Sequence, residues 1–132
     1  MKEYQRKKNN KYMLPHTVYQ STIWLIRDYY RQKQEMDEIL LESPPPPDGM
    51  PSGHALSNEP AAKAQRRAQN FKKTTAIENG LLSIPEEYRS GVWNNVQYGK
   101  RYPDDADRHT YGRYKAKFIY EVALGMEFIE KK

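Results

Sequence analysis

Four consecutive prolines, Pro44 to Pro47, divide this chain into two parts that cannot form one continuous helix. Proline lacks a backbone N–H and its ring clashes with the preceding turn, so a run of four ends any helix that reaches it and favours polyproline II. An Asp-Gly turn signal and further polar residues follow. We interpret residues 43–58 as a linker, with a proline-rich recognition site as the rarer alternative.

The segment before the linker has the periodicity of an amphipathic helix, and we predict one long helix over 17–42. Its apolar stripe consists of Val18, Leu25, Ile26, Tyr29, Met36, Ile39 and Leu40. A lone helix would not expose this much apolar surface, so it must pack on the rest of the chain or on a second copy. We expect it to self-associate into a homodimer. Residues 1–16 are basic and polar, and we expect a disordered arm there.

Three further helices are predicted after the linker, over about 59–82, 84–98 and 109–125. Gly80 weakens the end of the first of them, while Ser83 and Glu86 form a capping-box pattern at the start of the second. The apolar side of the last helix is formed by Tyr111, Tyr114, Phe118 and Val122, with Ile119 beside them. No segment alternates convincingly like a strand, so the predicted fold class is all-α.

The segment over about 84–126 is the candidate functional unit within a predicted helical domain over 59–132. We predict a helix-turn-helix arrangement in this segment. It consists of a capped helix, a tight loop, a one-turn helix over the acidic residues 104–107 and a basic last helix. In such a unit the second helix reaches base edges in the major groove, while nearby cations hold phosphates. The candidate DNA-binding residues are Lys100, Arg101 and Arg108 for phosphates, and His109, Thr110, Tyr111, Arg113, Tyr114 and Lys117 in the helix. Judged by the charge pattern alone, a helical hairpin whose basic face is merely solvated explains these residues equally well.

The layout resembles the phage late-gene transcription regulators of the RinA/ArpU type, whose C-terminal part is related to the fourth region of sigma factors. The similarity covers nearly the whole chain through short motifs: Ile26-Arg27-Asp28-Tyr29-Tyr30, the proline-rich linker, Ile84-Pro85-Glu86-Glu87-Tyr88-Arg89, Tyr102-Pro103-Asp104-Asp105-Ala106 and 118–125. The chain departs from the family in the turn of its motif, which is compressed to Asp107-Arg108.

That resemblance implies a regulator that binds double-stranded DNA in the cytoplasm of a bacterial host and activates phage or prophage late genes. In the family, the segment matching 109–117 is the recognition helix. We also expect host RNA polymerase as a partner of this chain. The net charge of +5 permits nucleic-acid binding without requiring it.

Other function classes find little support in the sequence. Cysteine is absent, which removes thiol catalysis and Cys-based zinc sites, and the three histidines lack ligand spacing. The aspartates at 104, 105 and 107 are better explained by the start of a helical segment than by a metal site. No nucleophile-base pair or nucleotide fingerprint occurs, and no apolar stretch is long enough to span a membrane. We therefore expect no enzyme, no cofactor, no metal and no membrane partner.

Two alternatives stay open at this point. A terminase small subunit would also be small, helical and DNA-binding, but it would form a ring that serves DNA packaging. A phage protein-interaction module or inhibitor would instead place the basic helix against an acidic surface of a host protein. A steep salt dependence of binding to random duplex DNA would favour DNA binding over the second alternative.

Overall fold

The computed structural model describes residue 5, residues 10–42 and residues 59–130, and within these ranges it contains five helices and no strand. The predicted all-α class is confirmed, while the predicted linker over 43–58 lies outside the described residues. The helices are α1 His16–Arg27, α2 Tyr29–Glu42, α3 Glu59–Leu82, α4 Glu86–Tyr98 and α5 Arg108–Gly125. None of these helices is long and apolar enough to cross a membrane.

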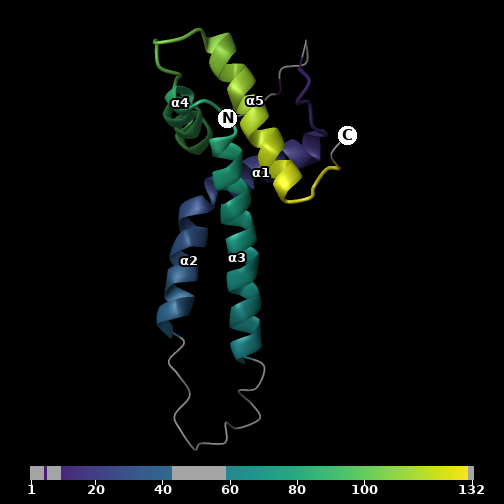
Figure 1. Ribbon diagram of the computed structural model, residues 1–132, viewed down its shortest axis with the longest axis vertical. Helices are drawn as coiled ribbons and strands as arrows, with labels where there is room; N and C mark the ends of the chain where they lie inside the picture. The colour runs from purple at the N-terminus through teal and green to yellow at the C-terminus, as the bar shows by residue number, and fades with distance from the viewer. Residues whose placement is uncertain (1–4, 6–9, 43–58, 131–132) are drawn as a thin grey trace, which may run out of the picture.

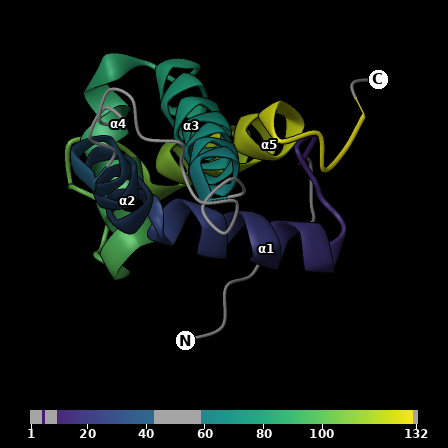
Figure 2. The ribbon, with the colours of Figure 1, turned by 90° about the horizontal axis from the view of Figure 1, so that it is seen from below.

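The helices form a head from which an arm projects (Figure 1). The arm is the antiparallel pair of α2 and the first part of α3. The head consists of α1, α4, α5 and the last part of α3. Viewed from below, α1 runs across the base of the arm, and α4 and α5 lie on different sides of α3 (Figure 2). The two halves of the chain on either side of the prolines therefore pack together.

One hydrophobic core joins these halves in the head. The segment before the linker contributes side chains that are almost fully buried, and so do α3, α4 and α5: Leu14, Tyr19, Ile23, Ile26, Ile77, Ile84, Val92, Val96, Phe118, Ile119 and Val122. Met36 of α2 is buried against α3 as well. The apolar stripe of 17–42 is thus largely covered by the chain's own helices, which removes the reason for expecting self-association through it.

The predicted long helix over 17–42 is wrong at Asp28, where the chain bends and α1 gives way to α2. At the bend, side-chain amides add hydrogen bonds to carbonyls at the end of α1, which also receive backbone N–H groups. Gln32 Nε2 donates to the Leu25 carbonyl (3.1 Å), and Gln97 Nε2 of α4 donates to the Ile26 carbonyl (2.6 Å). Because these partners come from outside the local helix, the apolar periodicity contains no sign of the bend.

The end of the N-terminal segment is folded, contrary to the expectation of disorder over 1–16. Leu14 is buried in the core, and α1 already begins at His16. The side-chain amide of Gln5 accepts a hydrogen bond from the Leu14 backbone N–H (2.8 Å) and donates one to its carbonyl (2.7 Å). Burial of one apolar side chain thus fixes the residues just before α1 to the head.

The junction between α3 and α4 differs from the predicted capping box. The helix α3 continues through Gly80 to Leu82, and the Ser83 hydroxyl donates to the Gly80 carbonyl at the end of that helix. The N-cap of α4 is Pro85, which makes no side-chain capping bond. The end of α4 agrees with prediction, because Gly99 closes it in the left-handed conformation (φ 68°) that glycine adopts without strain.

Gly80 lies where α3 packs tightly against α5. A Cβ atom at this position would lie 2.7 Å from Val122 Cγ2 and 3.2 Å from the Phe118 carbonyl oxygen, whereas a Cβ at Gly112 of α5 would meet nothing within 4 Å. We expect Gly112→Ala to stabilise the protein by about 0.5–1 kcal/mol through helix propensity. Gly80→Ala gains the same free energy of helix propensity, but its methyl group overpacks the crossing of α3 and α5, which costs about 1–3 kcal/mol. Urea unfolding of both variants measures the difference, and equal stabilisation of the two would contradict this packing.

Candidate nucleic-acid interface

The start of α5 is fixed by Asp107, which is the N-cap of the helix. Its carboxylate accepts a hydrogen bond from the His109 backbone N–H (3.0 Å), and this bond, aided by the nearby charges of Arg108 and Arg113, holds the pKa of Asp107 below its usual range. A carboxylate at this position also suits the positive end of the helix dipole. The helix therefore begins at a defined residue, one position before the predicted start.

The connection between α4 and α5 differs from the predicted one. Residues 104–106 form turns and bends, so the one-turn helix expected over 104–107 is wrong. Asp107 and Arg108 are not a compressed turn, since the first caps α5 and the second is its first residue. The whole segment 99–107 joins the two helices.

Tyr111 is fully buried, so it cannot contact bases, and this part of the predicted reading face is wrong. Its ring stacks on Tyr102 (centroids 5.1 Å apart) and meets the ring of Tyr88 edge-on (5.2 Å). Its hydroxyl donates to Asp105 Oδ1 (2.5 Å). Burial, followed by this hydrogen bond, raises the pKa of Tyr111 to about 12. Tyr111 thus ties the connecting segment and α4 to the first turns of α5.

Tyr114 lies at the edge of the same cluster. The Tyr114 ring stacks on Tyr88 of α4 (centroids 4.8 Å apart, planes 20° apart) and is half-buried. Thr110 is half-buried too. Gly91 of α4 permits this packing, because a Cβ there would lie 2.7 Å from Tyr111 Cε1. The aromatic cluster holds α5 firmly against α4 while its opposite face stays accessible.

The accessible face of α5 carries the remaining predicted side chains. Arg108, His109 and Arg113 are exposed, and Lys117, one turn after Arg113, is partly exposed. Lys100 and Arg101 are exposed in the segment before the helix. We call these six residues the cationic face. In the described part of the chain, none of its lysines and arginines forms a salt bridge with a carboxylate.

The N-terminal segment adds a cation that the sequence did not place here. The ring of Tyr12 packs on Tyr120 of α5 (centroids 5.5 Å apart), and Lys11 Nζ lies 5.3 Å from the centre of the Tyr12 ring. Tyr120 follows Lys117 by three residues, so this contact lies just beyond the cationic face. In the sequence, the one indication of this contact is Tyr120, an aromatic residue on the polar side of the last helix.

The described residues offer no candidate metal centre. No group of three His, Cys, Asp or Glu side chains comes together within the ranges that the structure covers. Asp105 accepts the Tyr111 hydroxyl and Asp107 caps α5, so both carboxylates have structural partners. These roles account for two of the three aspartates before α5.

No protein family, no curated protein and no solved structure matches this chain.

Proposed function

We propose that this protein is a sequence-specific double-stranded DNA-binding regulator of transcription, with the cationic face as its DNA-contacting surface. The observation that carries the proposal is the arrangement of α5. Its buried side is anchored by the aromatic cluster, and its accessible side presents Arg113 and Lys117 with further cations at its N-terminus. A rigid helix with a basic face and a defined N-terminus suits insertion into the major groove.

The contacts divide by position along this surface. Arg113 and Lys117 project from one face of α5 and are proposed to contact base edges, with Thr110 beside them. Lys100 and Arg101, in the segment before α5, would hold phosphates together with Arg108. In this proposal α4, the connecting segment and α5 act in the manner of a helix-turn-helix unit with a long connection. The phage late-gene setting and contact with host RNA polymerase are proposed from the motif resemblance alone.

The proposal is tested by selecting bound sequences from a random duplex DNA library and measuring the affinity for the enriched sequence by gel shift. Each base contact is worth about 1–3 kcal/mol, so Arg113→Ala/Lys117→Ala is expected to weaken specific binding at least about 30-fold. Both side chains are accessible, so we expect the circular dichroism spectrum to stay unchanged.

The matched control is Arg31→Ala/Lys33→Ala on α2. It removes the same charge from side chains that are 60% and 47% exposed and take part only in surface ion pairs. We expect it to retain specific binding. Failure of the selection to enrich any sequence would refute the proposal, and full specific binding by the Arg113/Lys117 variant would refute the assignment of the base-contacting face.

A further inference from the structure

The helix α3 carries an accessible apolar stripe that no part of the described chain covers. Phe71 is 58% exposed and Leu82 is 62% exposed, and Ala64 and Ala68 are exposed as well. Their spacings of four, three and eleven residues place all four on one face of the helix. Between Phe71 and Leu82 the same face carries the polar residues Thr75, Glu78 and Asn79, so the continuous part of the stripe runs from Ala64 to Phe71, about 10 Å of helix.

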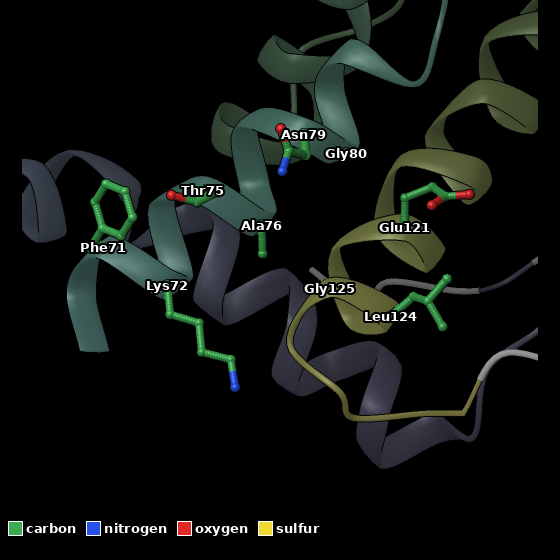
Figure 3. A pocket seen from close by; sticks show the side chains of 9 residues that line it. All are labelled: Phe71, Lys72, Thr75, Ala76, Asn79, Gly80, Glu121, Leu124 and Gly125. Carbon is green, nitrogen blue, oxygen red and sulfur yellow. The ribbon is translucent and has the colours of Figure 1, made fainter. Parts of the chain in front are cut away.

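A groove of about 490 Å³ lies beside this stripe, between α3 and the C-terminal half of α5 (Figure 3). Small residues form much of its lining, namely Ala76 and Gly80 on α3 and Gly125 on α5. Phe71 and Leu124 add larger apolar surface on the two sides. The groove is therefore open and lined largely by apolar groups.

The charges at the groove have opposite signs on its two sides. Lys72 extends from α3, whereas Glu121 lies on α5 (Figure 3). Glu127, just after α5, adds a second carboxylate, which lies 3.9 Å from Lys72 Nζ. The Lys72 and Glu127 side chains are 51% and 82% exposed, so their pairing within one copy contributes little to stability. An acidic protein surface or a nucleic acid would be disfavoured by the carboxylates of this patch.

We propose that this groove is the contact surface of a symmetric dimer of two copies of this chain. A two-fold axis through the groove places α3 of one copy over α5 of the other. Phe71 of each copy then packs against Leu124 and the small residues of the other copy. Lys72 of each copy likewise faces Glu121 of the other. The charges of the patch are thus complementary under a two-fold axis, as a contact between identical surfaces requires.

The dimer does not depend on the proposed function, because its surface lies beyond the cationic face. If the proposed function holds as well, the dimer would present two copies of the cationic face related by a two-fold axis. Such an arrangement binds a site whose two halves are inverted repeats. A selected DNA sequence with inverted repeats would support both the dimer and the proposed function. The dimer itself is measured without DNA, so the two proposals can fail separately.

The first test is the mass of the full chain in solution, by analytical ultracentrifugation at micromolar concentrations. The monomer mass is 15.6 kDa, and we expect twice that value. Phe71→Ser is expected to raise the dissociation constant at least about 30-fold, as loss of a central aromatic anchor does. Trp24→Ser is the matched control, because Trp24 is a 65% exposed aromatic side chain on α1 and is expected to leave the dimer intact. A wild-type monomer at high micromolar concentration overturns the proposal, as does a dimer that Phe71→Ser leaves unchanged.

The second test asks whether the occupant is a copy of this same chain. Lys72→Glu alone and Glu121→Lys alone each place like charges opposite one another in a symmetric dimer, so each variant is expected to be mainly monomeric. An equal mixture of the two restores both opposite-charge contacts, and we expect heterodimers to form. Their absence from the mixture overturns the arrangement. Because these side chains are at the surface, circular dichroism is expected to show unchanged folding.

Discussion

Replacing Tyr111 by alanine is expected to lower the free energy of unfolding by about 3–5 kcal/mol, the range for truncating a fully buried aromatic residue. The ring is completely buried between Tyr102 and Tyr88. Its removal leaves a cavity where the connecting segment, α4 and α5 meet. It also deprives the two neighbouring rings of contacts that are favourable beyond simple burial.

Urea unfolding measures this effect, and two further variants locate its origin. Tyr111→Phe keeps the stacked ring and removes only the hydrogen bond to Asp105, so we expect a loss of about 0.5–1.5 kcal/mol. Arg113→Ala, two residues further on the accessible face, is expected to change stability by no more than about 0.5 kcal/mol. A base-contacting role for Tyr111 predicts the reverse, with little effect of Tyr111→Ala on stability and a large effect on DNA affinity.

The helices after the linker were predictable because their signals are local. Apolar periodicity gave 59–82 as observed for α3, and it placed the start of α5 within one residue. Gly99 ends α4 through its own backbone preference. The same periodicity correctly placed Tyr111 on the apolar side of α5, and its assignment to base contact conflicted with that placement. Tyr111 stands seven residues before Phe118 and eleven before Val122, and this spacing puts all three on the buried side of α5.

The features that were missed depend on contacts between distant segments. The bend at Asp28 is stabilised by Gln97, which comes from another helix. Gly80 looks in the sequence like a weak point of a helix, but in the structure it is where α5 crosses α3. The groove beside that crossing combines residues some fifty positions apart, so no local pattern indicates it. Periodicity predicts which side of a helix is buried, but it does not identify the partner.

The junction of α3 and α4 depends on Arg89, and its loss is expected to destabilise the protein by about 2–3 kcal/mol. Arg89 Nε donates to the carbonyls of Leu81 and Ile84 (3.0 Å each), and Nη2 donates to that of Leu82 (3.2 Å). These carbonyls lie at and just after the end of α3, where few backbone donors remain, although the Leu81 carbonyl also accepts the Ile84 N–H (3.3 Å). The guanidinium therefore caps the end of α3 from the first turns of α4, whereas the predicted capping box of Ser83 and Glu86 concerned the start of α4.

Comparison of Arg89→Met with Arg31→Met in urea unfolding tests this role. Arg31 forms two ion pairs with carboxylates, but its side chain is 60% exposed, so its replacement is expected to cost no more than about 1 kcal/mol. Arg89→Lys keeps the charge but loses the planar fork that reaches three acceptors, and an intermediate loss is expected. If Arg89→Met were no more harmful than Arg31→Met, water would suffice to satisfy the end of α3. A larger loss of stability for Arg89→Met than for Arg31→Met would show that the carbonyls at the end of α3 need donors from the protein. It would do so although Arg89 donates there to backbone carbonyls, whereas Arg31 pairs with carboxylates.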